Sequence, residues 1–320
     1  MKKFTSANIV DLVGVGGTGS WLYQILDNFQ FGYRNPIFIL HDFDIVEAKN
    51  LIRQNFYEED IGRFKGSATI DKSGASGNFS FDKKYCKENV SVAADIVIGL
   101  VDTIDSRHDI LQVIASGNHP VLLIDTGNED TYGQVMLIYY DGEDFIIPEA
   151  YKGLISKVDS EVRQGSCTDY IEQTASINKS NAALTAAIYS RLIDLIHKYN
   201  ENLTSVSSNS TSVCRRQPVN EYVNYSDVIK QLNINESIYI NHKLKFDTLD
   251  QHFSEFDNAF EFAFYKTASI FWNSYAVSTD NESELISLSI DEINEINKNR
   301  IEANRLAKAV KGKSDERQWC

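Results

Sequence analysis

A glycine-rich turn between a short apolar segment and a helix is the feature that most constrains how this chain folds. It stands in the run NIVDLVGVGGTGSWLYQIL, where Ile9–Val13 has the apolar character of a buried strand. Gly14, Gly16 and Gly19 fit the G-x-G-x-x-G spacing, and Gly17 is an additional glycine between them. Because glycine has no Cβ, such a turn lets the backbone approach a phosphate chain, and the helix N-terminus that follows offers free N–H groups. The segment therefore predicts a nucleotide-binding strand–turn–helix unit.

Two carboxylates follow the next predicted strand, which covers residues 36–40. Asp42 lies at the distance from the glycine turn where an acidic side chain meets the ribose hydroxyls of a bound nucleotide, and Asp44 follows two residues later. A glycine turn alone also occurs where a helix simply packs tightly on a strand. Strand, turn, helix, strand and carboxylate in this order favour nucleotide binding over that alternative.

The polar residues beyond these carboxylates distinguish adenylyl transfer from hydride transfer. A dehydrogenase needs an acidic residue on the ribose and no fixed cluster beyond it. Here NLIRQ supplies Asn50, Arg53 and Gln54, and DIGRFK supplies Lys65. In order, GVGGTGS, DFDIVEAKNLIRQ and DIGRFK resemble the patterns GxGGxGS, DxDxVxxxNLxRQ and DxGxxK of the ubiquitin-activating-enzyme-like superfamily, which includes the ThiF and MoeB adenylyltransferases.

The chemistry of adenylation agrees with that resemblance. A carboxylate attacks the α-phosphate of ATP while pyrophosphate leaves, so the site needs cations on the phosphates and usually a carboxylate that holds Mg²⁺. Arg53 can grip phosphate oxygens in a bidentate fork and Lys65 can act as a point charge, and we predict both to be catalytic. The alternative for both side chains is a solvated loop.

The resemblance continues after a buried strand predicted at residues 95–100. In DTIDSR, Asp102 matches the family's Mg²⁺–ATP carboxylate and Arg107 its structural arginine. The alternative for Asp102 is a cap on the following helix. The resemblance thus implies ATP and Mg²⁺ as ligands, with Mg²⁺ on Asp102, and it implies this nucleotide-binding set: Gly14, Gly16, Gly17, Gly19, Asp42, Asp44, Asn50, Arg53, Gln54, Lys65 and Asp102.

The middle of the chain predicts a change of strand direction and a crossing loop. Strands are indicated at 121–125 and 133–140, and the family runs at this place from a parallel strand into antiparallel ones. Residues 141–166 have little periodicity and predict a loop over the active site, before a long helix at 177–200. We therefore expect an α/β fold, a Rossmann-like and mostly parallel sheet with an antiparallel extension, plus a C-terminal α+β or mainly helical extension.

Cys167 is the candidate nucleophile outside the nucleotide site. In ubiquitin-activating enzymes, a cysteine at this point in the order takes the activated acyl group as a thioester. The surrounding SCTDYIEQTASINKSNAALTAAI is similar to single-domain activating enzymes, and more so to ThiF-type proteins of bacterial gene clusters that encode ubiquitin-like proteins. A thiolate suits the step because it is a strong nucleophile whose acyl adduct stays reactive. The alternative is a small buried residue at a helix start.

Composition excludes several classes of function. The 320 residues carry a net charge of −14, which would repel nucleic acid and anionic lipid. We find no apolar run of membrane-spanning length and no secretory signal, and so expect a cytoplasmic protein. The four cysteines form no C-x-x-C pair, so the structural zinc site of many adenylyltransferases has no ligands here.

The expected organisation is an adenylation domain over residues 1–200 that carries Cys167 on its crossover loop, a connector at 201–219, and an accessory region at 220–320. The accessory region would recognise a partner. It contains an aromatic helix predicted within 249–272, whose aromatic face is typical of a core, and an amphipathic helix at 290–310.

The leading functional hypothesis is activation of the C-terminal carboxylate of a small ubiquitin-like or sulfur-carrier-like protein, by a homodimer with a conjugating enzyme as a further partner. Three alternatives remain open. They are a peptide-modifying adenylyltransferase without a catalytic cysteine, a nicotinamide-dinucleotide dehydrogenase, and a scaffold that binds nucleotide without catalysis.

Overall fold

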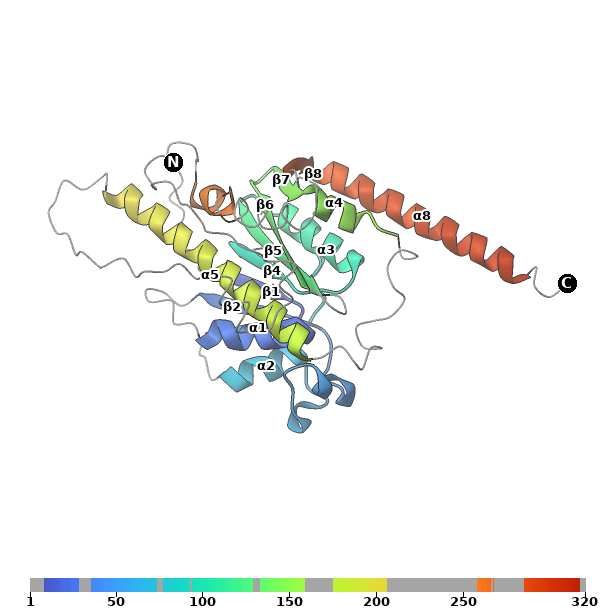
Figure 1. Ribbon diagram of the computed structural model, residues 1–320, viewed down its shortest axis with the longest axis horizontal. Helices are drawn as coiled ribbons and strands as arrows, with labels where there is room; N and C mark the ends of the chain where they lie inside the picture. The colour runs from blue at the N-terminus through green and yellow to red at the C-terminus, as the bar shows by residue number, and fades with distance from the viewer. Residues whose placement is uncertain are drawn as a thin grey trace.

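The computed structural model contains an α/β fold built on one mixed sheet (Figure 1). It describes residues 9–28, 36–73, 77–92, 94–128, 133–158, 175–205, 258–265, 267 and 285–316. The sheet has eight strands in the order β3-β2-β1-β4-β5-β6-β7-β8. From β3 to β5 neighbouring strands are parallel, and from β5 to β8 they are antiparallel. The Rossmann-like, mostly parallel sheet with an antiparallel extension is therefore confirmed.

The elements have the following bounds. The strands are β1 Ile9–Val13, β2 Ile37–His41, β3 Phe79–Phe81, β4 Ile96–Gly99, β5 Val121–Asn128, β6 Gly133–Tyr140, β7 Asp144–Pro148 and β8 Leu285–Ser289. The α-helices are α1 Gly17–Asn28, α2 Lys65–Ser73, α3 Ile104–Ala115, α4 Glu149–Ile155, α5 Ala175–Ser205 and α8 Ile290–Glu316. Two short 3₁₀ helices, η1 Ala48–Ile52 and η2 Glu58–Asp60, lie between β2 and α2.

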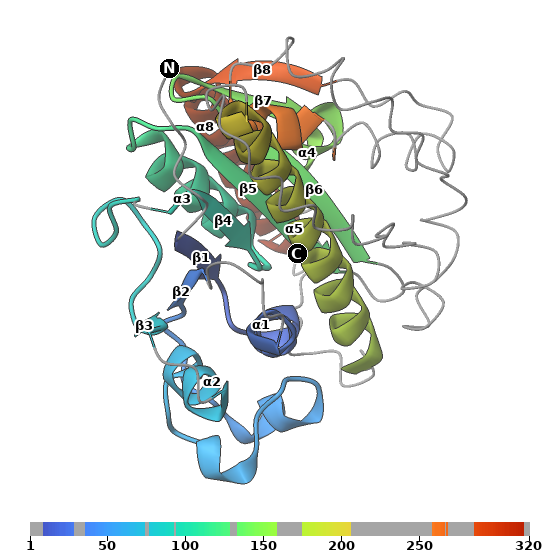
Figure 2. The same ribbon diagram turned by 90° about the vertical axis from the view of Figure 1, so that its left-hand side faces the viewer.

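Helices cover both faces of the parallel strands, which explains why β1 and β4 are almost continuously apolar. On one face, Leu12 of β1 belongs to the same core as Leu22 of α1 and Leu192 of α5. On the other face, Val97 of β4 packs in a core with Leu111 of α3. Figure 2 shows α5 crossing the sheet beside α1, with α8 on the far side. This arrangement leaves the C-terminal ends of β1, β2 and β4 as the edge where ligands bind in such sheets.

The C-terminal part of the chain adds a strand to the sheet. β8 pairs antiparallel with β7, with Phe145 opposite Leu288, and continues directly into α8. Ile293 of α8 is buried, and Arg300 pairs with Asp105 at the start of α3, whereas the end of α8 extends away from the sheet (Figure 1). The amphipathic helix predicted from residue 290 is confirmed, while the strand before it is a finding of the structure.

The crossing loop predicted at residues 141–166 is wrong over its first half, which contains β7 and α4. Phe145 and Ile147 are both buried because they alternate along a strand that pairs with β6 on one side and β8 on the other. A segment this short becomes a strand through its neighbours rather than through its own periodicity. Residues 159–166 lie outside the described ranges.

The aromatic helix predicted near residue 260 is confirmed over its described part, residues 259–265. Phe260, Phe262 and Phe264 are all buried, and the Phe264 ring stacks on Tyr139 with 5.6 Å between ring centroids. Phe260 and Phe264 lie on one face of the helix and Phe262 on the opposite face, so the core encloses the helix on both sides. The interpretation of its aromatic face as core is therefore correct.

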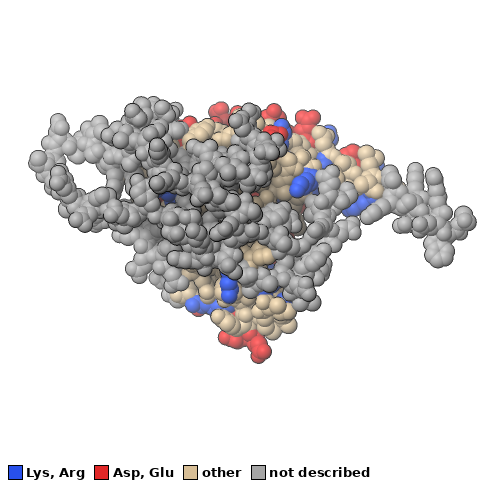
Figure 3. All heavy atoms as spheres, in the orientation of Figure 1, with Lys and Arg blue, Asp and Glu red and all other residues tan. Residues whose placement is uncertain are grey.

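The surface carries charges of both signs. Where described residues are visible in Figure 3, both acidic and basic side chains lie on the surface. Among the described residues, no helix combines the length and the apolar character needed to span a membrane.

Candidate nucleotide-binding site

The glycine turn is held between the ends of β2 and β4. Gly14 has a φ of +97°, a conformation that glycine adopts without strain, and its N–H donates to the carbonyl of His41 at 2.9 Å. A Cβ at Gly14 would lie only 2.7 Å from the carbonyl oxygen of Leu100, and one at Gly19 would overlap the Gly14 carbonyl. The first and last glycines of the pattern are thus required by close approaches of backbone, as the spacing predicts.

Asp42 fastens this turn from the end of β2. One carboxylate oxygen accepts a hydrogen bond from the N–H of Val15 at 2.6 Å, and the other accepts from the N–H of Asp44 at 2.8 Å. Burial raises the pKa of Asp42, and the nearby Lys65 ammonium opposes that rise. A buried carboxyl with a shifted pKa at the ligand-binding edge of the sheet is typical of a functional site.

Lys65 brings a buried cation to the same corner. Its ammonium lies 2.8 Å from a carboxylate oxygen of Asp44, and the backbone N–H of Lys65 donates to the Asp44 backbone carbonyl at 2.9 Å. The lysine side chain is 9% exposed whereas that of Asp44 is 54% exposed. The solvated carboxylate can therefore move aside, while the ammonium keeps its place at the first residue of α2 and remains available to an anionic ligand.

Asn50, Arg53 and Gln54 are presented by η1 and the turn that follows it. The side-chain oxygen of Asn50 accepts from the N–H of Glu47 at 2.8 Å, and its carbonyl accepts from the N–H groups of Arg53 and Gln54 at 3.3 and 2.9 Å. Asn50 therefore shapes the turn by capping it. Arg53, which follows this cap, is buried and is therefore not a solvated loop residue.

Gln54 carries an unsatisfied acceptor beside the glycine turn. It is buried, and its side-chain oxygen has no hydrogen-bond partner among the described residues. A Cβ placed on Gly16 would lie 4.0 Å from the side-chain nitrogen of Gln54, so the amide faces the turn. A buried polar atom without a partner is unfavourable, which makes the Gln54 side-chain oxygen a candidate acceptor for a ligand.

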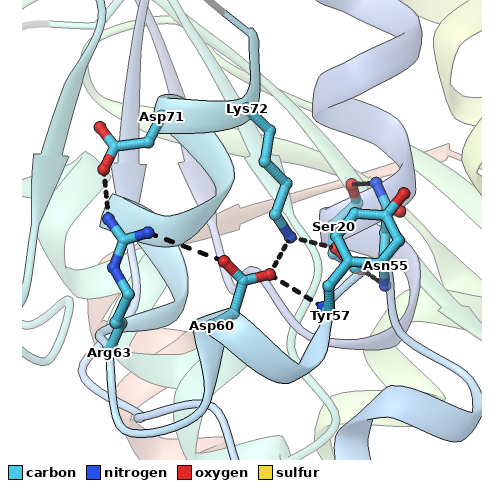
Figure 4. Close-up of polar contacts among 7 residues, drawn as sticks. All are labelled: Ser20, Asn55, Tyr57, Asp60, Arg63, Asp71 and Lys72. Atoms are coloured by element: carbon cyan, nitrogen blue, oxygen red, sulfur yellow. Dashed lines mark hydrogen bonds and ion pairs between the residues drawn. The ribbon is translucent and has the colours of Figure 1, made fainter.

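A second set of contacts joins residues 55–60, which follow the Arg53 turn, to α1 and α2 (Figure 4). The Lys72 ammonium lies 2.5 Å from Asp60 and donates to the carbonyl of Asn55 at 2.7 Å. The N–H of Asn55 donates in turn to the hydroxyl of Ser20 in α1 at 3.0 Å. Sequence reasoning missed Lys72 and Ser20. The sequence around these two helical residues does not indicate which distant residues they contact in the folded protein.

Asp102 lies just beyond the end of β4 and is exposed. The N-cap of α3 is Thr103, whose hydroxyl accepts from the N–H of Ser106 at 3.1 Å. Arg107 is buried in an ion pair with Asp125 at 3.0 Å. Asp102 is thus an exposed residue at the ligand edge, and Thr103 rather than Asp102 caps the following helix.

Two exposed carboxylates, those of Asp44 and Asp102, lie near this edge, and Asp44 is paired with Lys65. In the described part of the chain, no three His, Cys, Asp or Glu side chains gather into a metal site. Mg²⁺ suits such a place, because it keeps several waters and is commonly bound by one or two carboxylates together with substrate phosphates. Asp102 therefore fits a cation that arrives with a nucleotide rather than one held by the protein alone.

The fold brings the predicted nucleotide residues from the glycine turn to Lys65 together at one edge. Asp42 binds the glycine turn, Gln54 faces it, and Lys65 acts on Asp42. The β4 end that leads to Asp102 touches the same turn through Leu100. Cys167 lies outside the described residues.

Comparisons with known proteins place the chain in a family. Its sequence matches the ThiF family over residues 1–222, and no curated protein matches it. Among solved structures, E. coli MccB with ATP is 20% identical, with a TM-score of 0.42, over 59% of this chain and 56% of that one. E. coli TcdA, a tRNA N6-threonylcarbamoyladenosine dehydratase, in complex with AMP is 23% identical over 33% and 44%, with a TM-score of 0.29. PaaA is 18% identical over 58% and 55%, with a TM-score of 0.39.

The chain thus spans just over half the length of MccB. The sequence match to the family is the broader finding, because it extends over 222 of the 320 residues. That stretch includes the glycine turn, the turn that carries Arg53, and Lys65 at the head of α2. The protein belongs to the ThiF family.

Proposed function

We propose that this protein adenylates the C-terminal carboxylate of a small ubiquitin-like or sulfur-carrier-like protein, with ATP as co-substrate. The observation that carries the proposal is the placement of a buried lysine, Lys65, beside a glycine turn that Asp42 fastens at the ligand edge. Adenylation joins two anions, and buried cations close to a helix N-terminus offset the repulsion between them.

Each residue has a role in this proposal. The glycine turn and the N-terminus of α1 bind the phosphates, and the Gln54 amide accepts from the nucleoside. Arg53 and Lys65 neutralise charge as a carboxylate oxygen of the carrier bonds to the α-phosphorus and pyrophosphate leaves with the electrons of the broken bond. Mg²⁺ would be held by Asp102 together with phosphate oxygens and would supply further positive charge.

A thioester step follows in the full proposal. The thiolate of Cys167 attacks the acyl adenylate, the carbon–sulfur bond forms, and AMP leaves. The acting species is a homodimer in the cytoplasm, and residues 220–320 recognise the carrier or a conjugating enzyme. The step is supported by the resemblance to ubiquitin-activating enzymes, in which a cysteine at this point in the order takes the activated acyl group.

The decisive assay is exchange of labelled pyrophosphate into ATP in the presence of candidate carrier proteins, or of peptides with a free C-terminal carboxylate. We expect exchange in the wild-type protein and its loss in Asp102→Ala. Cys167→Ala should retain exchange but lose a carrier adduct that thiol reagents release. A protein that binds NAD and shows no exchange with any acid would contradict the proposal. An adduct that persists in Cys167→Ala would place the nucleophile elsewhere.

A further inference from the structure

Helix α5 holds the backbone of the turn that carries Arg53, although it lies more than a hundred residues further along the chain. The side-chain amide of Asn178, in the first turns of α5, donates to the carbonyl of Arg53 at 3.2 Å. The indole N–H of Trp21 in α1 donates to the same carbonyl, also at 3.2 Å. Both contacts hold the main-chain carbonyl of Arg53.

The shared carbonyl stands at the end of η1, where a helix leaves its last carbonyl groups without internal partners. Upstream, the N–H of Arg53 already donates to Asn50 at 3.3 Å. With its N–H and carbonyl both bound, the Arg53 backbone has little freedom to rotate. Three contacts therefore hold the backbone from which the Arg53 side chain leaves the turn, and one of them comes from α5.

Asn178 also touches the glycine turn itself. A Cβ added to Gly17 would lie 2.7 Å from the side-chain nitrogen of Asn178 and 2.9 Å from its oxygen. The absence of a side chain at Gly17 is thus what lets the buried Asn178 reach across the start of α1. One carboxamide joins the phosphate-binding turn to the backbone of the predicted phosphate-binding arginine.

We propose that Asn178 is a positioning residue that sets the placement of Arg53 against the bound phosphates. The inference rests on the proposed function for its catalytic consequence. The placement itself is a property of the protein without ligand. Asn178 touches neither the reacting atoms nor the substrate in this scheme, and acts through Arg53.

The chain offers a matched control on the same helix. Asn181 is 3% exposed, as is Asn178, but it donates to the Thr126 hydroxyl at 2.7 Å and to the Gly127 carbonyl at 3.1 Å, both in β5. Asn181→Ala therefore removes a buried amide from α5 without touching the Arg53 turn. Asn178→Asp is a further variant, because it keeps the size of the side chain and removes the N–H donor.

The experiment measures how fast phenylglyoxal modifies Arg53 in the full-length protein without nucleotide, located by peptide mass spectrometry. We expect Asn178→Ala and Asn178→Asp to speed modification of Arg53 about fivefold, the effect of one lost hydrogen bond. Asn181→Ala should leave the rate at the wild-type value. Trp21→Phe should speed it too, and Trp21→Phe with Asn178→Ala should exceed the product of the single effects, because each donor supports the carbonyl when the other is absent.

Pyrophosphate exchange is measured on the same variants. Asn178→Ala should lower kcat more than it changes KM for ATP, because misplaced charge is felt most in the transition state. An unchanged Arg53 modification rate in Asn178→Asp, or an equal acceleration in Asn181→Ala, would overturn the inference. Absence of exchange in the wild-type protein would contradict the proposed function alone, since the modification rates would still report on the placement of Arg53.

Discussion

The ammonium of Lys65 lies 2.8 Å from the carboxylate of Asp44, and the two side chains differ sharply in their exposure to solvent. The lysine is nearly enclosed, whereas the aspartate is more than half exposed. An ion pair of this kind ties the lysine in place before a ligand arrives. A phosphate can replace the carboxylate at small cost, because the carboxylate is already close to water.

Replacement of Lys65 by Met should weaken ATP binding about tenfold or more, because a hydrogen bond to a charged phosphate is lost. Lys49 provides the control, since it pairs with Glu47 on the surface of the same loop and is 55% exposed. Isothermal titration with ATP should show a large loss for Lys65→Met and wild-type affinity for Lys49→Met. Equal affinities for the two variants would exclude Lys65 from the phosphate site.

Asp42 should make stability depend on pH in a definite direction. Burial raises the pKa of Asp42 above its ordinary value, so its contribution to stability is fully present below the unfolded pKa and is lost as the pH rises through the folded pKa. Relative to Asp42→Asn, the wild-type protein should therefore be less stable at about pH 7 than at about pH 4, the ordinary pKa of an aspartate.

Urea unfolding of the two proteins at both pH values measures this difference, in which the other titrating groups cancel. A difference that does not vary with pH would mean that Asp42 ionises as freely in the fold as in the unfolded chain. In the same variant ATP affinity should fall, because the amide presents an N–H₂ group where the carboxylate accepts from Val15 or Asp44.

The Lys72–Asp60 pair should contribute more to stability than the neighbouring Arg63–Asp60 pair, in which the arginine is exposed. Asp60 has a side chain only 3% exposed, so Lys72→Met leaves a buried charge with less compensation, and the free energy of unfolding should fall by about 2–3 kcal/mol. Arg63 also faces Asp60, at 3.7 Å, but is 41% exposed. Arg63→Ala should therefore cost less than about 1 kcal/mol. Chemical denaturation gives both values, and equal losses would show that the clamp of Figure 4 does not depend on burial.

His108 should make the protein sensitive to mild acid. Its buried ring donates through Nε2 to the carbonyl of Ile155 at 3.0 Å, and burial lowers the pKa of His108. The stability that such a group contributes to the protein is present above the unfolded pKa and is lost as the pH falls through the folded pKa. His108→Gln should thus lose less stability than the wild type between about pH 7 and about pH 5, with a difference of at most about 1.4 kcal/mol per pH unit. Urea unfolding midpoints at the two pH values check this, and parallel losses would contradict it.

The parts of the site that the sequence predicted are those whose requirements are local. Gly14 needs a positive φ, and Asp42 follows its strand directly, so both are visible in the order of residues. The first half of the predicted crossing loop went wrong because β7 owes its strand conformation to β6 and to β8, which lies far along the chain. Periodicity within a short segment cannot report pairing with a distant one.

The sequence by itself determined the parallel strands, the glycine turn and the residue types that meet at the ligand edge, because apolar runs, backbone geometry and charge are properties of short segments. Only the tertiary structure decided that α5 supplies Asn178 to the Arg53 carbonyl, that Lys72 closes on Asp60, and that β8 completes the sheet. Those contacts join segments that are distant in the chain or that follow a turn. Their geometry exists only once the hydrophobic cores on the two faces of the sheet have packed.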